Sequence, residues 1–338
     1  MRIALDAMGG DYAPAINVEG AVETVNDLEG IDVILVGDES SIKRELESKK
    51  YLPNRISIKH ASQVVGMDES PSVAIRKKRD SSIRRAIELV KNGEADAFVS
   101  AGHSGVVMAT ALLLLGDSIG VDRPAIAAIM PTLKAPFVLI DAGANLYCKP
   151  ENLLQFALMG SAYCRVIFGK SEPKVALLSI GEEDTKGNEL TKEAFKLLKK
   201  VDINFTGNID GKDIFTGIAD VIVCDGFTGN IVLKTSEGLA DAIVRILKRE
   251  IVDQSAGRIG YLLMKSALKS FKKKTDYSEY GGAPLLGING TCIISHGRST
   301  TKAIRNALRV AADLSEKKVH EIIAFEIEKG MVSKVDKK

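Results

Sequence analysis

Two loops in this 338-residue chain combine glycines with a hydroxyl residue in a pattern that can bind an oxyanion. The loops are Gly102-His103-Ser104-Gly105 and Asp225-Gly226-Phe227-Thr228-Gly229, and their segments align as ADAFVSAGHSG and ADVIVCDGFTG. Each loop joins an apolar stretch typical of a buried strand to a segment with helical periodicity. Such a junction leaves free backbone N–H groups at the first helical turn, where phosphate commonly binds. We predict that the Gly102–Gly105 and Gly226–Gly229 amides, with Ser104 and Thr228, form an anion site with two walls.

Other strand ends carry side chains that could complete such a site. Asn145 ends the segment Asp-Ala-Gly-Ala-Asn, and Asn230 follows the second loop; both are candidates for orienting a substrate. Lys149, Lys186 and Lys234 are candidates for supplying positive charge beside an anion. Ligands of open α/β sheets bind outside the carboxyl ends of the strands, so we place the predicted active site there.

The acidic and sulfur-containing residues near these loops suggest fewer chemical roles. Asp6, Asp141 and Asp225 are expected to fix loop geometry, or simply to cap turns, because a carboxylate beside phosphate would repel it. Cys224 is the thiol nearest the predicted site, and an acyl-cysteine intermediate is the alternative to direct attack by phosphate. His103 could donate a hydrogen bond to phosphate or serve as a structural histidine.

Strand-like and helix-like segments alternate along the chain, which predicts an α/β fold with a mostly parallel sheet. We treat residues 1–338 as one α/β unit with a basic amphipathic helical arm at about 250–280. This arm could lie on a membrane, form a helical dimer contact or simply face the core. A second basic helix is expected over 74–90, as a solvated face or as a surface for an acidic partner. We also expect a serine-capped helix over 40–50.

Composition excludes several classes of protein. With 46 basic and 44 acidic residues the net charge is +2, which gives no global case for nucleic-acid binding. The four cysteines lack paired spacing, and no secretory signal is visible, so we expect reduced thiols and a cytoplasmic protein. The sequence has no G-x-G-x-x-G, no phosphate-loop lysine motif, no G-x-S-x-G and no metal-ligand spacing of its histidines. We therefore predict no metal and no cofactor.

Longer motifs resemble those of a known family. The segments DAMGGD, SAGHSG, CKPENLLQFA, GEEDTKGNEL, LKTSEG and GGAPLLGINGTCIISHG, spread over nearly the whole chain, are similar to the bacterial acyl carrier protein:phosphate acyltransferases of phospholipid synthesis. The resemblance implies reversible transfer of a fatty acyl group from acyl carrier protein to inorganic phosphate. It also implies an αβα sandwich similar to isopropylmalate dehydrogenase and phosphotransacetylase, a homodimer and peripheral membrane association. The acidic carrier protein would then dock on a basic helix, at Arg76–Arg85 or at 258–274.

The residue types are compatible with this reaction. Phosphate attacks an activated thioester without a strong base, so the main tasks are to hold it beside the carbonyl and to stabilise the oxyanion. We therefore expect direct displacement without an acyl-enzyme. The nearest alternative is a phosphotransacetylase-like enzyme that uses acyl-CoA. A decarboxylating dehydrogenase and a membrane-docking scaffold are more distant alternatives that explain the glycine loops less well.

Overall fold

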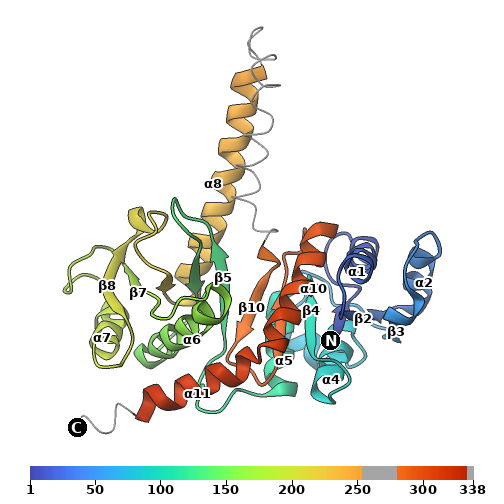
Figure 1. Ribbon diagram of the computed structural model, residues 1–338, viewed down its shortest axis with the longest axis horizontal. Helices are drawn as coiled ribbons and strands as arrows, with labels where there is room; N and C mark the ends of the chain where they lie inside the picture. Colours follow the sequence, from blue (N-terminus) through green and yellow to red (C-terminus); the bar gives the residue numbers. More distant parts are fainter. Residues whose placement is uncertain (253–279, 333–338) are drawn as a thin grey trace.

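The computed structural model describes residues 1–252 and 280–332, arranged around a single mixed β-sheet (Figure 1). Its strands are β1 (Arg2–Asp6), β2 (Asp32–Gly37), β3 (Ile56–His60), β4 (Ala97–Ser100), β5 (Ala125–Met130), β6 (Phe137–Ile140), β7 (Val175–Ser179), β8 (Phe205–Asp210), β9 (Val221–Val223), β10 (Ala283–Leu286) and β11 (Thr291–Ile294). The helices are α1 (Ala15–Asp27), α2 (Glu39–Glu47), α3 (Pro71–Lys77), α4 (Ser82–Lys91), α5 (Ser104–Leu115), α6 (Pro150–Phe168), α7 (Glu189–Leu198), α8 (Gly226–Val252), α10 (Thr301–Glu316) and α11 (Val319–Val332), with short 3-10 turns η1 (Pro53–Arg55) and η2 (Gly211–Asp213).

The direction of the strands reverses in the middle of the sheet. The order is β3-β2-β1-β4-β11-β10-β5-β6-β9-β7-β8. The pairs β11–β10, β10–β5 and β5–β6 are antiparallel, and the other neighbouring pairs are parallel. Three successive reversals make β6 and β9 run opposite to β1 and β4. The sheet is mostly parallel, as predicted, and the two glycine loops leave strands that run in opposite directions.

Helices cover both faces of the sheet and produce the predicted αβα sandwich. Alternate residues of β1 divide between two cores: Ile3 and Leu5 belong to the core that also contains residues of α1, α6, α10 and α11, whereas Ala4 belongs to the core with residues of α3, α4 and α5. This division follows from the two-residue side-chain period of a strand. In the second half of the sheet, β6 and β9 form a third core that includes Val232 and Leu233 of α8. Apolar residues on both sides of these strands explain why their sequences read as continuous apolar runs.

Two expected helices differ from the structure. The basic stretch at 74–90 is not one helix: α3 ends at Lys77, and α4 begins after Ser81, whose hydroxyl accepts the Arg84 N–H. The first helix turn of α2 is capped by Asp38, whose carboxylate accepts the Ser41 N–H, and not by serine. The carboxylate is the better cap because its charge also complements the helix dipole. The predicted arm at about 250–280 lies mostly outside the described residues.

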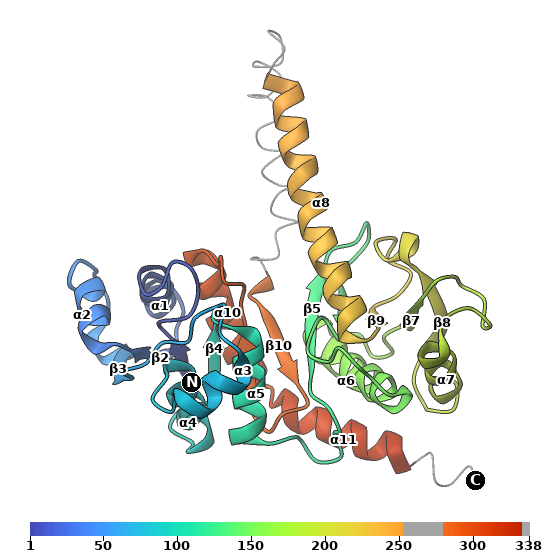
Figure 2. The ribbon, with the colours of Figure 1, turned by 180° about the vertical axis from the view of Figure 1, so that it is seen from behind.

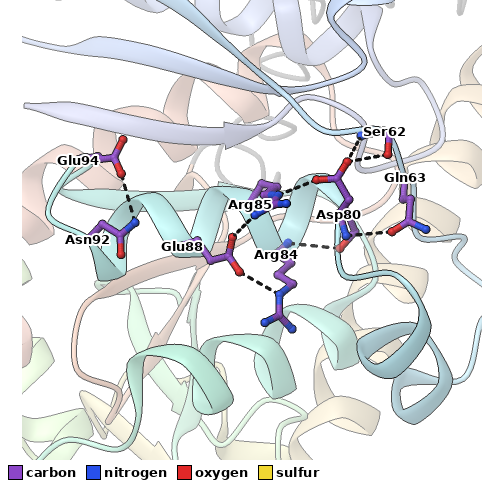
Figure 3. A network of polar contacts seen from close by, with 9 residues as sticks. Ser62, Gln63, Asp80, Arg84, Arg85, Glu88, Asn92 and Glu94 are labelled. Carbon is purple, nitrogen blue, oxygen red and sulfur yellow. Dashed lines mark hydrogen bonds and ion pairs between the residues drawn. The ribbon is translucent and has the colours of Figure 1, made fainter.

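A network of polar contacts joins α4 and the preceding Asp80 to the segment after β3, and it neutralises part of this basic stretch (Figure 3). Asp80 accepts Arg85 Nε at 2.6 Å and the Ser62 hydroxyl at 2.6 Å. Glu88 pairs with Arg84 and with Arg85, each at 2.9 Å. Hydrogen bonds from Ser62, followed by the one from Arg85, lower the pKa of Asp80, so this carboxylate stays ionised. Arg84 and Arg85 are therefore held by internal partners.

Helix α8 begins in close contact with the loop that follows β6 and then projects away from the body of the protein (Figures 1 and 2). A side-chain carbon on Gly229 would lie 1.9 Å from the Asp141 carbonyl oxygen, and one on Gly226 would lie 2.6 Å from that of Asn145. Both distances are far below van der Waals contact, so only glycine permits this approach. These two glycines set the position of every side chain further along α8.

We expect Gly229→Ala to destabilise the protein by about 3 kcal/mol or more, because the new methyl group must push α8 off the Asp141 carbonyl. Gly238→Ala is the matched control in the same helix, since nothing lies within 4 Å of its added carbon. That control should raise stability by about 0.5–1 kcal/mol through helix propensity. Urea denaturation of the full chain measures both. Equal stability of the two variants would contradict the close-approach argument.

Candidate active site

A cavity of about 330 Å³ lies over the central strands, between the start of α5 and one side of α8. It brings together residues that follow β4, β6 and β11, although β6 runs opposite to the other two. The strand registers make this possible. Ile140, the last residue of β6, pairs with Ala127 of β5, and the neighbouring Ile126 pairs with Leu285 of β10. The adjacent Pro284 pairs with Ile293, so β6 ends at the level where β11 ends. Polar and charged side chains in the lining are Asp11, Ser104, Asn230, Lys234, Glu237, Tyr280, Ser295, His296 and Arg298. Apolar lining residues include Met67, Ile126, Ala128, Leu233, Ala283 and Ile294.

The first glycine loop opens into this cavity through Gly102 and Ser104. The Gly102 N–H donates to the Ser100 hydroxyl at 2.9 Å, and that hydroxyl donates to the buried Asp6 carboxylate at 2.7 Å. Burial raises the pKa of Asp6 despite these hydrogen bonds. His103 occupies the N-cap position of α5 without a side-chain hydrogen bond. Within the described part of the chain, the Ser104 and Gly105 N–H groups meet no acceptor, so they are available to an anion.

The second glycine loop is closed by its own carboxylate. Asp225 accepts the Thr228 N–H at 2.9 Å and the Thr228 hydroxyl at 2.7 Å. The Gly226 N–H donates to the Asn145 carbonyl at 2.8 Å, and the Gly229 N–H donates to the Asp225 carbonyl at 2.9 Å. In this conformation these three predicted amide donors are occupied within the protein, and their glycines serve the close packing described above.

One position explains why the two aligned loops differ. Asp225 aligns with Ala101, which has no side-chain acceptor. Capped by Asp225, α8 starts at Gly226; without such a cap, α5 starts only at Ser104, two positions later in the alignment. The capping carboxylate occupies the position where an anion would bind the first turn. Of the two predicted walls, the structure therefore leaves the first open, and in the second only the Phe227 N–H meets no acceptor among the described residues.

Asp141 organises the loop between β6 and α6. Its carboxylate accepts backbone N–H groups of Ile126, Gly143, Ala144 and Asn145 and the Asn145 side-chain amide, at 2.7–3.1 Å. Burial raises the pKa of Asp141, and these hydrogen bonds oppose that effect. Asn145 also donates to the Pro124 carbonyl at 2.7 Å. Both side chains are occupied in holding the loop, and neither is part of the cavity lining.

The three predicted lysines lie in different surroundings. Lys234 is in the cavity lining, with Asn230 one helical turn before it on α8. Lys149 is an exposed residue at the N-cap of α6, and its N–H donates to the Asn152 side chain. Lys186 is exposed in the loop after β7, which is separated from β6 by β9 in the sheet. Only Lys234 among them reaches the cavity.

Sequence reasoning missed the contribution of the segment after β11. His296 and Arg298 line the cavity, and the Arg298 N–H donates to His296 Nδ1 at 3.1 Å. Burial, followed by the charge of Lys234, lowers the pKa of His296 and favours the neutral imidazole. The available signal was the string Ser-His-Gly-Arg directly after an apolar strand, which repeats the pattern of the first loop. Its parallel pairing with β4 could not be read from the sequence.

The remaining candidates have structural surroundings. Cys224 is buried, its thiol lies 3.6 Å from the Asp141 carbonyl oxygen, and burial raises its pKa well above the usual thiol value. A thiol of this kind is a poor nucleophile. His103 is half-buried, and its Nδ1 has no hydrogen-bond partner among the described residues. Over residues 1–252 and 280–332, no three His, Cys, Asp or Glu side chains converge as metal ligands. No helix in the same residues is sufficiently long and apolar to cross a membrane.

Comparisons with known proteins agree with this architecture. The sequence matches the family described as "Fatty acid synthesis protein" over residues 1–322. It is 59% identical over 324 residues to a phosphate acyltransferase from Thermodesulfovibrio yellowstonii, covering 96% of this chain and 93% of that protein. It is 52% identical over 330 residues to one from Geotalea uraniireducens, covering 98% and 95%. A phosphotransacetylase from Streptococcus pyogenes superposes with a TM-score of 0.61 over 94% of each chain at 20% identity, which establishes a likeness of fold.

The sheet order, the two helical layers and the central cavity define an α/β protein with a phosphotransacetylase-type fold, as predicted. The chain belongs to the "Fatty acid synthesis protein" family, whose match extends over nearly its whole length. The resemblance to phosphate acyltransferases seen in the sequence motifs is confirmed by these relatives.

Proposed function

We propose that this protein is an acyltransferase that moves a fatty acyl group reversibly from acyl carrier protein to inorganic phosphate, forming acyl phosphate for phospholipid synthesis. The observation that carries the proposal is a single cavity that combines open α5 amides and cationic side chains with an extended apolar lining. The polar groups suit phosphate, and the apolar lining suits the first part of an acyl chain. The phosphate acyltransferase relatives supply the reaction.

In the proposed mechanism, the Ser104 and Gly105 N–H groups and the Ser104 hydroxyl bind phosphate, and Lys234 and Arg298 supply positive charge. Asn230 lies beside Gly143, since a carbon added to that glycine would lie 3.4 Å from Asn230 Cβ. Its side-chain amide donates to the carbonyl oxygen of the thioester as negative charge develops there. A phosphate oxygen forms the new bond to the acyl carbon, and the carbon–sulfur bond breaks. The single proton of HPO4²⁻ ends on the departing sulfur, so thioester and HPO4²⁻ become thiol and acyl phosphate dianion without net proton exchange.

Direct attack by phosphate fits the environment of Cys224 better than an acyl-enzyme does. The raised pKa of this buried thiol keeps it protonated, and Cys224 is absent from the cavity lining. Phosphate, in contrast, is itself an anionic nucleophile that the cavity can hold beside the carbonyl. We therefore propose a ternary complex of phosphate and thioester, and no covalent intermediate on the protein.

We expect Lys234→Met to raise the KM for phosphate at least tenfold, because the variant loses a charge-assisted contact worth about 1.5–3 kcal/mol. The KM for the acyl donor should change much less. Arg245→Met is the matched control, since this substitution also removes one positive charge from α8, but at an exposed position outside the cavity. Acyl phosphate formation from palmitoyl carrier protein measures both constants. An unchanged KM for phosphate in Lys234→Met would remove this residue from the mechanism.

We further propose that an acidic carrier protein docks on α3. Arg76, Lys77 and Val73 are all exposed, and their helical spacing places them on one face of α3. A carbon added to Gly105 would lie 3.2 Å from Pro71 Cγ, so α3 begins directly beside the open loop. Arg84 and Arg85 are held by Asp80 and Glu88, and Lys78 is held by Glu69. Among the described residues, the cations of the predicted Arg76–Arg85 surface without an ion-pair partner are therefore Arg76, Lys77 and Arg79. The second predicted docking helix, 258–274, lies outside the described residues.

Reversing the charges of Arg76 and Lys77 to Glu should raise the KM for acyl carrier protein at least tenfold at low salt and much less at high salt, since screening weakens the attraction. The KM for acyl-CoA, which has no acidic protein surface, should stay within about twofold. The control is Lys192→Glu with Lys200→Glu, two exposed positions in α7 and just after its end, in the other half of the sheet. Equal effects on both donors would contradict α3 docking, and faster turnover of acyl-CoA than of the carrier thioester would favour the phosphotransacetylase-like alternative.

We also propose a homodimer formed through α8. Leu239, Ile243, Ile246 and Leu247 follow helical spacing and are each at least 40% exposed. An apolar stripe of this kind on a projecting helix can pack against the same stripe of a second copy, because the two stripes then remove each other from water. Peripheral membrane association is the alternative use of such a stripe.

Ile243→Glu with Leu247→Glu should convert the dimer to a monomer, because the new carboxylates would be buried opposite each other. Sedimentation velocity measures the oligomeric state, and Arg245→Glu, on the opposite side of α8, is the control. A double variant that remains dimeric would contradict this interface. Co-sedimentation with anionic vesicles tests the alternative: loss of pelleting without a change of oligomeric state would assign the stripe to the membrane.

A further inference from the structure

The cavity contains carboxylates as well as cations. Lys234 Nζ lies 2.9 Å from Glu237 Oε2, and Arg298 Nε lies 3.7 Å from Asp11 Oδ2; all four residues line the cavity. A carboxylate repels any fully ionised oxyanion, so acidic groups add nothing to a site that attracts anions by positive charge alone. Their presence among the lining residues therefore requires a separate explanation.

Glu237 is the better placed of the two carboxylates. Its side chain is 23% exposed, against 44% for Asp11, so its interactions are less weakened by solvent. Lys234 occupies Oε2, and within the part of the chain that the structure describes Oε1 accepts no hydrogen bond. One oxygen of Glu237 therefore fixes the lysine, and the other remains as a negatively charged acceptor in the same cavity as the donors Lys234 and Arg298.

We propose that Glu237 is a specificity-determining residue that selects phosphate over sulfate by accepting a hydrogen bond from the phosphate O–H. This inference rests on the proposed function. Near neutral pH inorganic phosphate still carries a proton, whereas sulfate carries none and has the same tetrahedral shape. The amides of α5, Lys234 and Arg298 are donors and cannot distinguish the two ions. A carboxylate can, because it gains a charge-assisted hydrogen bond from phosphate and only repulsion from sulfate.

The same contact would orient the bound phosphate. When the O–H points at Glu237, the remaining unprotonated oxygens face the α5 amides and the cations, and one of them is the nucleophile. Glu237 does not touch the reacting carbonyl in this arrangement, so it acts through the orientation and identity of the anion. Lys234, one helical turn before Glu237, donates a hydrogen bond to it. The carboxylate that selects the anion and the ammonium group that attracts it are therefore held together.

The test is the ratio of sulfate affinity to phosphate affinity in the wild type, Glu237→Gln and Asp241→Asn. Asp241 is the matched control, because it is an exposed carboxylate on α8 outside the cavity lining. Equilibrium dialysis with labelled phosphate, displaced by increasing sulfate, gives the ratio on the full chain without any turnover. Glutamine keeps the size of the side chain but can donate to sulfate, so Glu237→Gln should shift the ratio at least tenfold towards sulfate. Asp241→Asn should stay within twofold of the wild type.

The ratio of sulfate affinity to phosphate affinity measures selectivity separately from the overall affinity for anions. Releasing Lys234 from its partner would strengthen the binding of both anions alike and leave the ratio unchanged, so a ratio within twofold of the wild type in Glu237→Gln would overturn the proposal. Sulfate inhibition of acyl phosphate formation should follow the same order. If the wild type selects phosphate in dialysis but forms no acyl phosphate, the proposed function fails and the role of Glu237 stands.

Discussion

The packing of the first turn of α8 against the loop after β6 is the constraint on which the cavity depends. Gly229 allows the helix backbone to meet the Asp141 carbonyl, and the buried Asp141 carboxylate holds the loop with five hydrogen bonds to its surroundings. Once that contact is fixed, the helical repeat places Asn230, Lys234 and Glu237 along one side of α8, at successive turns facing the cavity. The opposite wall, at the start of α5, is positioned in the same way by Asp6 through Ser100.

The two halves of the sheet use one local design with two outcomes. In each half, an aspartate at the end of one strand supports a glycine loop after the neighbouring parallel strand: Asp6 beside β4 and Asp141 beside β9. The difference arises from a single carboxylate, because Asp225 caps α8 and the aligned Ala101 leaves α5 uncapped. An internal cap and an external anion use the same donors, so a helix can have one or the other. The capped loop at the start of α8 fixes the position of that helix, and the uncapped loop at the start of α5 is available to bind an anion.

Local patterns were sufficient to predict the class of fold and the open loop. Apolar runs gave the strands, and glycines followed by a hydroxyl gave the start of α5, because these features depend on neighbours in the sequence. The reversal of the sheet depends instead on β10, a strand within the glycine-rich segment 281–290 whose antiparallel pairing with β5 and β11 joins residues far apart in the chain. Without that pairing, the segments that follow β7 and β9, which carry Lys186 and Lys234, look equivalent. His296 and Arg298 were missed for the same reason: their place in the site is set by the register of β11 against β4.

The balance of charge in the cavity bears on how product would leave. Lys234 and Arg298 are matched by Glu237 and Asp11, and a lowered pKa favours neutral His296, so the described lining is close to neutral. In the proposed reaction, phosphate enters as HPO4²⁻ with one O–H and leaves as an acyl phosphate dianion that has given this proton to the thiol. Substrate and product then carry equal charge, and the cations attract both alike. Only an acceptor distinguishes them: the carboxylate of Glu237 gains a hydrogen bond from the protonated substrate and faces bare oxygens in the product. The group proposed to exclude sulfate would thus also weaken the hold on acyl phosphate, because both ions lack the same proton.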